Sequence, residues 1–398
     1  MVYNIFIKLN NNFIQTNRNI NRRRGDGSMW QEKLVSMNDN RKLKGKKLGV
    51  VFGTFAPMHR GHVHLIQSAK TENDGVIVVV SGYEGDRGDV IGLDLQRRFR
   101  YAREVFKNDE LVKVVKLDET NIKRYPEGWA DWLTKVDVEL KKSSFEGTTF
   151  NFYVGETEYE EQLNIRRPEY RVTLEDRSEL PISATLIRND PYKYWNYIAH
   201  PFRRHFTKKV LVAGTASTGK TSRVKDLGRL FNAPYSLEYA REYQEKYNIT
   251  DEELDANDYM YLLKGQYQQT SDIIDGKENN GLVVADTNST VTMAYLIYYL
   301  KDTITEEEYN LLESLYINTV KREEWDLILF TVPFGEYVDD GFRDMTMAED
   351  SIRDDFMSLM QDLFKKAGFD CPIVYLGDSY SETYQTAVKE VSQLIKAD

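Results

Sequence analysis

The stretch Gly53-Thr-Phe55-Ala-Pro57-Met-His59-Arg-Gly61-His62 follows the apolar run 48–52, and a helical pattern begins directly after it. A second stretch, Gly214-Thr-Ala-Ser217-Thr218-Gly219-Lys220-Thr221, follows the apolar run 209–213 in the same way. A glycine-containing turn between a buried strand and a helix start is a setting in which backbone N–H groups bind phosphate. Two such stretches on one chain predict two nucleotide sites and two linked reactions.

Strand and helix patterns alternate around the first stretch. Buried strands are expected at 48–52, 75–81, 111–117, 150–154 and 170–174, and helices at 62–70, 95–106 and 129–141. This alternation predicts a parallel, doubly wound α/β sheet. Ligands of such sheets bind beyond the carboxyl ends of the strands, which is where the first stretch lies.

The second half of the chain repeats this pattern. Further strands are expected at 209–213, 282–287, 326–332 and 372–376, with long helices such as 348–366 between them. We therefore predict two doubly wound parallel-sheet domains. The predicted division is a basic, disordered tail over 1–45, a first domain over 46–190, a connector over 191–207 and a second domain over 208–398.

Composition excludes several classes of protein. The chain has 398 residues, of which 41% are hydrophobic and 29% charged, as in globular proteins, and it has no apolar run of 18 residues, so we expect no membrane contact. Its only cysteine, Cys371, excludes an internal disulfide and favours a cytoplasmic location. With one Cys and five His, a structural zinc site is not expected.

Charge is distributed unevenly. Residues 1–48 carry 11 Lys or Arg against 3 Asp or Glu, a net charge of +8, whereas the whole chain carries −10, so the remainder carries −18. An acidic body argues against general affinity for nucleic acid. The basic segment is too short for a DNA-binding domain with its own core, and we expect no such domain.

The first stretch has residues suited to transfer of a nucleotidyl group. Gly53 lets the backbone approach an anion, and His59 and His62, three residues apart at a helix start, can point the same way. With the helix N-terminus they can hold a triphosphate and stabilise charge at its α-phosphorus. We assign His59 and His62 to catalysis, and Gly53 and Phe55 to ATP binding. The alternative is that the two histidines only cap or pack.

A later segment supports this interpretation. Pro181-Ile-Ser183-Ala-Thr185-Leu-Ile-Arg188 places two hydroxyls and a guanidinium at an expected helix start, where they suit the β- and γ-phosphates of ATP. Alone it would more often be a helix cap with a surface arginine. Together, the HxGH and ISxTxxR motifs resemble those of the nucleotidylyltransferase superfamily.

Two further segments narrow the resemblance. Ser81-Gly-Tyr83-Glu-Gly85-Asp86-Arg87-Gly88 and Tyr125-Pro126-Glu-Gly128-Trp129-Ala-Asp-Trp132 resemble the adenylyltransferase half of the bifunctional NadR family. That half joins nicotinamide mononucleotide to AMP from ATP, which makes NAD and pyrophosphate. The resemblance implies that Asp86, Arg87 and Trp129 bind the mononucleotide, with Trp129 stacked on the cationic pyridinium ring. The alternative for Trp129 is a place in the core stripe of its helix.

The second stretch matches the Walker A pattern. Gly214 and Gly219 let the loop wrap a polyphosphate, with Ser217 and Thr218 between them, and Lys220 can reach the β- and γ-phosphates. Thr221 can ligate Mg²⁺. Asp286 ends the strand at 282–287, where a second Mg²⁺ ligand is required; the alternative is a capping role for this Asp.

The acceptor site of the second domain is less well marked. Glu238, Tyr239 and Arg241 follow the expected second strand, and acids there can bind ribose hydroxyls or take a proton. Asp339-Asp340-Gly341-Phe342-Arg343 is typical of a lid from which Arg343 can reach the transferring phosphoryl group. These segments resemble the ribosylnicotinamide kinase half of NadR, although each could also be a solvated loop.

Two positions depart from the family pattern. Leu237 stands where some members have Trp, and Asp286-Thr287-Asn288 has an amide where the pattern has a second acid. If Asn288 replaces a general base, either Asp286 or Glu238 must serve as the base, or the kinase is slow.

The resemblance implies a bifunctional enzyme of NAD salvage, with nicotinamide riboside, nicotinamide mononucleotide, ATP and NAD as partners. Two alternatives remain: a fused phosphopantetheine adenylyltransferase and dephospho-coenzyme A kinase, and a nucleotide-sensing transcriptional regulator. The sequence leaves open whether the chain forms a homo-oligomer.

Overall fold

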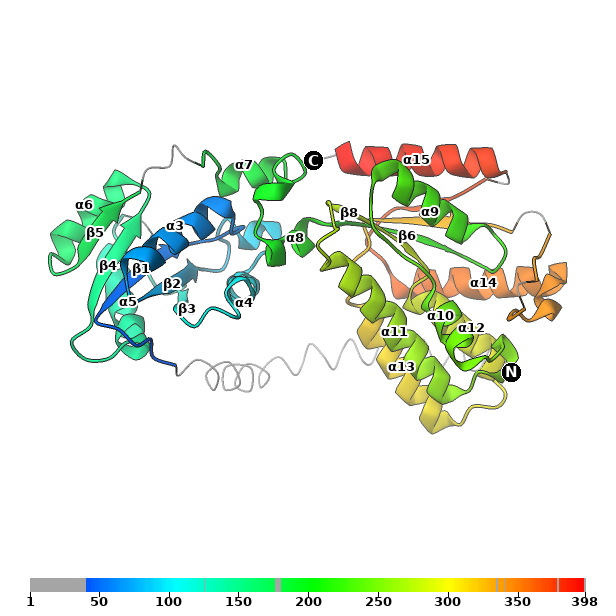
Figure 1. Ribbon diagram of the computed structural model, residues 1–398. Coiled ribbons are helices and arrows are strands. Elements are labelled where there is room, and N and C mark those ends of the chain that lie inside the picture. The colour runs from blue at the N-terminus through cyan, green and yellow to red at the C-terminus, as the bar shows by residue number, and fades with distance from the viewer. Residues whose placement is uncertain are drawn as a thin grey trace. The chain divides into compact units, whose positions relative to one another are not determined.

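The computed structural model describes residues 41–124, 126–175, 180–333, 336–339, 341–377 and 379–396 (Figure 1). Most of the predicted basic tail, and with it the expectation that it is disordered and has no DNA-binding domain, lies outside these residues. Within them, no helix has the length and apolar character needed to cross a membrane.

The described chain divides into two compact units. The first holds residues 41–55 and 62–180, and the second holds 56–61 and 181–396. The predicted division differs from this one, because residues 181–207 and the loop segment 56–61 make their contacts with the second unit. At the other end, the Leu43 side chain is buried in the core of the first unit, and Leu43 N–H donates to the carbonyl of Ser143.

The first unit is an α/β sheet with helices between its strands, as predicted. Its elements are β1 (Lys47–Gly53), α3 (Arg60–Glu72), β2 (Gly75–Gly82), α4 (Leu95–Val105), β3 (Val112–Asp118), α5 (Trp129–Ser143), β4 (Thr149–Val154), α6 (Thr157–Arg166) and β5 (Arg171–Leu174). Within the described residues, the five strands are parallel in the order β3-β2-β1-β4-β5. The order reverses beside β1, so the first loop begins at the switch point of the sheet, the usual place for a ligand.

The second unit contains another parallel sheet. Its elements are α7 (Ala184–Asn189), α8 (His200–Phe206), β6 (Lys208–Gly214), α9 (Lys220–Phe231), β7 (Tyr235–Ser236), α10 (Tyr239–Tyr247), α11 (Ala256–Ile274), β8 (Leu282–Asp286), α12 (Ser289–Leu300), α13 (Glu306–Val320), β9 (Leu327–Thr331), α14 (Asp350–Ala367), β10 (Ile373–Tyr375) and α15 (Tyr380–Lys396). The described strands lie in the order β10-β9-β6-β8-β7. Central strand β6 delivers the second loop to the edge where the strand order reverses.

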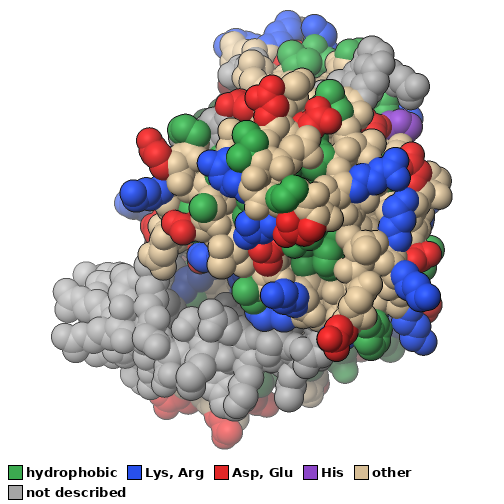
Figure 2. Space-filling view, turned by 90° about the vertical axis from the view of Figure 1, so that its left-hand side faces the viewer, with side chains coloured by type: hydrophobic (Ala, Val, Ile, Leu, Met, Phe, Trp, Pro, Cys, Tyr) green, Lys and Arg blue, Asp and Glu red, His purple; other side chains and the backbone are tan. Residues whose placement is uncertain are grey.

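Side-chain alternation explains why β6 is buried on both faces. Leu211 and Ala213 belong to the core cluster that contains residues of α12 and α14, whereas Val210 and Val212 belong to the one that contains residues of α9 and α15. A strand that is covered on both faces has a continuous apolar sequence, and this is why β6 could be predicted from the sequence. Figure 2 shows that the drawn face of the molecule, in contrast, has interspersed basic and acidic side chains.

Candidate active sites

The loop between β6 and α9 requires glycine at its first position. Gly214 has a φ of 142°, and a Cβ there would lie 2.1 Å from Oγ1 of Thr331. Gly219 caps α9 with a left-handed φ of 75°. A side chain at 214 would collide with strand β9, so this glycine is fixed by packing as well as by backbone conformation.

Polar side chains of this loop are held by the sheet beneath it. The Lys220 ammonium donates to the Thr215 carbonyl at 2.9 Å, and Oγ1 of Thr218 lies 2.6 Å from that of Thr331. Thr221 Oγ1 donates to the carboxylate of Asp286 at 2.5 Å. The structure therefore brings the predicted metal ligands together.

Asp286 is fully buried at the end of β8. Burial raises the pKa of its carboxyl to about 6, while the nearby Lys220 ammonium acts to lower this pKa. A carboxylate kept in such a place is costly without a cation to compensate it.

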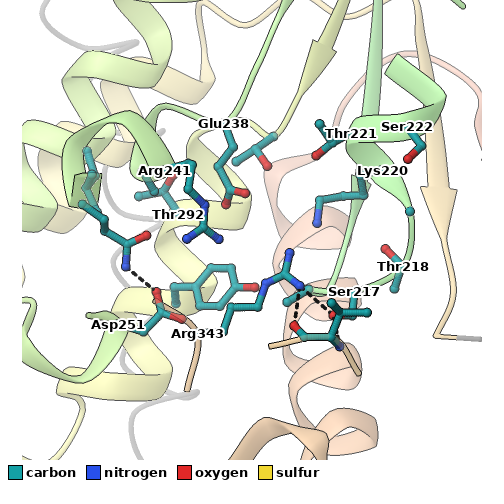
Figure 3. A pocket seen from close by; sticks show the side chains of 18 of the residues that line it. Ser217, Thr218, Lys220, Thr221, Ser222, Glu238, Arg241, Asp251, Thr292 and Arg343 are labelled. Carbon is teal, nitrogen blue, oxygen red and sulfur yellow. Dashed lines mark hydrogen bonds between the residues drawn. The ribbon is translucent and has the colours of Figure 1, made fainter. Parts of the chain in front are cut away.

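A cavity of about 390 Å³ opens beside the loop. Figure 3 shows that Lys220, Glu238 and Arg343 reach into it from three different segments. One end is lined by the loop and is basic. The other end is lined by Glu238, Asp251 and Arg241 together with aromatic rings, so two carboxylates and one guanidinium lie across the cavity from the loop.

The end across from the loop includes residues that sequence reasoning missed. Asp251 accepts a hydrogen bond from the side chain of Gln244 at 2.8 Å, and burial, followed by the proximity of Glu238, raises the pKa of its carboxyl. The buried ring of Tyr259 and the partly buried ring of Tyr295 line the same cavity. Asp251 lies in the helix-start pattern Thr250–Glu253, a capping box, and nothing in that pattern marks it as a ligand.

Other residues predicted for this site lie elsewhere. Tyr239 does not line the cavity, since its ring packs so closely on Gly265 of α11 that a Cβ there would lie 2.0 Å from it. Leu237 packs against the core of the sheet. Asn288 caps α12 and donates to the half-buried carboxylate of Glu323 at 2.7 Å, so its amide is engaged away from the lining residues.

The predicted lid residue contacts the loop directly. Nη1 of Arg343 donates to Oγ of Ser217 and to the carbonyl of Val338, both at 2.8 Å, and Val338 N–H donates to the same Oγ at 2.9 Å. Ser217 thus joins the loop to residues 338–343, and Arg343 lies at the basic end of the cavity.

In the first unit, Gly53, Phe55 and His62 lie around the carboxyl end of β1. The rings of Phe55 and His62 meet edge to face, with centroids 4.9 Å apart. A Cβ at Gly53 would lie 3.5 Å from the Phe55 ring, an ordinary contact. Space alone therefore does not require glycine at 53.

The loop after β2 is organised by Asp86. This buried carboxylate pairs with both terminal nitrogens of Arg98, at 2.7 and 3.1 Å, and accepts N–H bonds from Gly88 and Asp89. These contacts within the protein are sufficient reason for an aspartate at this position. The predicted contact between Asp86 and the nucleotide stays a prediction. Neighbouring Arg87 is oriented toward the first loop, where it donates to Oγ1 of Thr54 at 3.2 Å.

Trp129 lies in the core of the first unit. Its side chain is 6% exposed and meets Phe52, Trp132 and Tyr159 edge to face. This arrangement matches the core-stripe alternative. Stacking on a pyridine ring would require this aromatic cluster to open, and the stacking role stays a prediction.

The remaining predicted residues of the transferase belong to the second unit. Ser183 caps α7, where its Oγ accepts from Leu186 N–H. Arg188 donates from Nη1 to the carbonyl of Ala56 at 2.8 Å and from Nη2 to Oγ1 of Thr185 at 2.9 Å. His59 is 5% exposed and stands opposite Ile198 in an antiparallel bridge.

Comparisons with known proteins find a matching family for each half of the chain. Residues 50–190 match the family model described as cytidylyltransferase-like, and residues 209–382 match the model described as AAA domain. A crystal structure of NadR protein in complex with NR is 39% identical, with a TM-score of 0.79, and the match covers 89% of this chain and 97% of that one. The chain belongs to the NadR family.

Other NadR proteins give the same result. A NadR structure in complex with NAD and AMP-PNP is also 39% identical, with a TM-score of 0.77, and the match covers 90% of this chain and 98% of that one. The trifunctional NAD biosynthesis/regulator protein NadR of Salmonella typhimurium is 26% identical over 81% of this chain and 77% of its own length. The two-domain α/β prediction is thereby confirmed.

Proposed function

We propose that this member of the NadR family is a bifunctional enzyme of NAD salvage. The second unit phosphorylates the 5′-hydroxyl of nicotinamide riboside with ATP, which gives nicotinamide mononucleotide and ADP. The HxGH and ISxTxxR residues then let the 5′-phosphate of the mononucleotide attack the α-phosphorus of a second ATP. NAD forms and pyrophosphate leaves.

One observation carries the kinase half of this proposal: the phosphate loop with Lys220 lies at one end of the cavity, and two carboxylates, Arg241 and tyrosine rings lie at the other. A triphosphate fits the basic end. Nicotinamide riboside has a cationic pyridinium ring, and carboxylates with tyrosine faces stabilise such a cation. The relatives bound to NR and to AMP-PNP support the same pair of ligands.

The charged side chains of the cavity have distinct roles in the proposed phosphoryl transfer. Lys220 and Arg343 stabilise charge on the transferring phosphoryl group, and Glu238 accepts the proton of the attacking 5′-hydroxyl. Glu238 is favoured over Asp286, the other candidate base, because the Asp286 carboxylate is engaged by Thr221 beside the loop. Asn288 is an amide bonded to Glu323 and is not basic. Asp251 and Arg241 are suited to bind the ribose hydroxyls.

The donor set beside the loop fits Mg²⁺. A hydroxyl and a buried carboxylate in contact are oxygen ligands of the kind that this ion takes, with phosphate oxygens and water completing its shell. Thr221 and Asp286 would hold the ion, which would neutralise charge on the β- and γ-phosphates when bound. Cytoplasmic location and assembly into a homo-oligomer stay predictions.

For the transferase, positioning and electrostatics supply the rate and no covalent intermediate is needed. His59 and His62 stabilise the α-phosphate, Gly53 and Phe55 border it, and Ser183, Thr185 and Arg188 bind the other phosphates. Arg87 contacts the first loop through Thr54, which supports its assignment to the nucleotide site.

The alternatives are weaker. A fused enzyme of coenzyme A synthesis would share both loops, but the chain matches NadR proteins over most of its length. A regulatory role is named for the trifunctional relatives, and here the N-terminal segment that could bear on it lies outside the described residues.

The test is direct assay of the purified chain with ATP, Mg²⁺ and nicotinamide riboside. We expect mononucleotide first and NAD afterwards, measured by chromatography. Dihydronicotinamide riboside is a control of matched size without the positive charge, and we expect it to be the poorer kinase substrate. Failure to phosphorylate nicotinamide riboside would refute the kinase, and failure to make NAD from supplied mononucleotide would refute the transferase.

A further inference from the structure

Half of the first phosphate loop is held by the connector that follows α7. The carbonyl of Met58 accepts a hydrogen bond from Ala199 N–H at 3.0 Å, and His59 pairs with Ile198 in an antiparallel bridge. The guanidinium of Arg60 lies 5.9 Å from the centre of the Tyr197 ring. Three successive loop residues, with His59 in the middle, are therefore fixed by residues 197–199.

The connector is in turn anchored to the end of a kinase strand. Trp195, which is 6% exposed, donates from its indole N–H to the carbonyl of Asn279 at 2.9 Å. Its ring lies parallel to that of Tyr192, and a Cβ at Gly281 would meet both rings, at 2.7 and 3.4 Å. Gly281 immediately precedes β8, the strand that ends at Asp286.

Asn279 makes this anchor rigid. Its side chain is 3% exposed and donates to Thr207 Oγ1 at 2.8 Å and to the carbonyl of Ile274 at 2.7 Å, while its Oδ1 accepts from Gly281 N–H at 2.9 Å. The amide is thus held by the last residue of the connector, by the end of α11 and by the residue that precedes β8. A fully bonded buried amide specifies one local geometry.

We propose that Trp195 is a positioning residue for the transferase reaction, and that it acts by fixing, through Asn279, the connector on which His59 rests. This inference depends on the proposed transferase function of His59. It means that the kinase unit supplies part of the support for the transferase loop.

The mechanism is geometric. Positioning contributes to rate because a displacement of about 1 Å in a catalytic group can cost about 100-fold. Loss of the Trp195 anchor frees residues 197–199 to shift, and His59 shifts with them. Among the described residues, Trp195 does not line the cavity that contains Lys220, so phosphorylation of the riboside is expected to continue.

The experiment compares full-length variants in separate assays of the two steps. Trp195→Phe keeps one aromatic ring but removes the N–H donor with the rest of the indole, whereas Trp195→Ala removes the whole ring system. Arg204→Gln is the matched control, because it breaks another contact between connector and α11, the ion pair with Asp275 at 2.9 Å, without touching the loop.

From mononucleotide and ATP, we expect kcat for NAD formation to fall about tenfold in Trp195→Ala and about threefold in Trp195→Phe, with both KM values within about twofold. Kinase kcat should stay within about twofold in all variants, which also reports folding. Arg204→Gln should leave both steps unchanged.

Unchanged NAD formation in Trp195→Ala, or an equal loss in both activities, would overturn the inference. If Trp195→Ala does not fold, Trp195→Phe decides the matter by the same criteria. A wild-type chain that makes no NAD from mononucleotide would instead refute the proposed function.

Discussion

The two phosphate loops differ in what holds them. The loop at 214–221 is held by strands of its own sheet, through Thr331 on β9 and Asp286 on β8. The first loop leaves β1, but its residues 56–61 are held by Arg188 and by the connector, and they fall in the second unit. The P-loop is thus held by the sheet from which it leaves, whereas residues 56–61 of the first loop are held by chain that is not part of the β1 sheet.

The largest expected effect separates the two loops by activity. Lys220→Ala removes the ammonium from the kinase site and should lower riboside phosphorylation about 10²- to 10³-fold, while NAD formation from supplied mononucleotide stays unchanged. His62→Ala should lower NAD formation about 10²-fold and spare the kinase. Steady-state kinetics of each step measure both. Loss of both activities in either variant would contradict separate sites.

The fold could be predicted from the sequence because its strands are buried on both faces. The runs at 75–81 and 209–213 became β2 and β6 with bounds within one residue, since β-branched residues between glycines and charged residues leave few alternatives. Residues 56–61 could not be assigned to the second unit in this way. Their partners at 188 and 197–199 are joined to them by tertiary contacts that no local pattern marks.

The site was predictable where backbone conformation dictates residue type. Gly214 and Lys220 lie together because one strand–loop–helix unit places them there, and Asp286 joins them from the end of the adjacent strand β8. Asp251 and Asn279 were missed, since one resembles a helix cap and the other a surface turn, and only the folded chain buries their side chains. Asp86 is the opposite case: the sequence motif assigned it to the nucleotide, but in the structure its carboxylate is bound by Arg98 of the same unit.

The second prediction concerns support for the first loop from its own unit. Asp86→Asn leaves the buried guanidinium of Arg98 without its carboxylate, which should cost about 3–5 kcal/mol of stability. The first unit should melt at lower temperature, and the transferase, whose loop receives Arg87, should fail before the kinase does. Thermal unfolding followed by circular dichroism, with both enzyme activities measured at each temperature, tests this order. A kinase that fails first would show that Asp86 does not serve the first unit alone.

The same pair gives a pH dependence. Burial acts to raise the pKa of Asp86, but the hydrogen bonds from Arg98 and from the backbone N–H groups outweigh it and hold that pKa below its ordinary value of 3.8. A depressed folded-state pKa means that the stabilisation is complete above about pH 4 and is lost as the pH falls through the folded-state value. Asp86→Asn should therefore flatten the decline in stability below that pH.

The smallest effect separates the glycines that begin the two loops. A Cβ at Gly214 would lie 2.1 Å from Thr331 Oγ1 at a φ of 142°, so Gly214→Ala should lower stability by about 1–3 kcal/mol and impair the kinase. A Cβ at Gly53 would meet only the Phe55 ring, at 3.5 Å, so Gly53→Ala should leave stability within about 1 kcal/mol. If Gly53 serves the approach of an anion, that variant should raise KM for ATP in NAD formation without a change in melting temperature. An unchanged KM would assign the phosphate contact of the first loop to its histidines and helix N-terminus, and not to a bare backbone at 53.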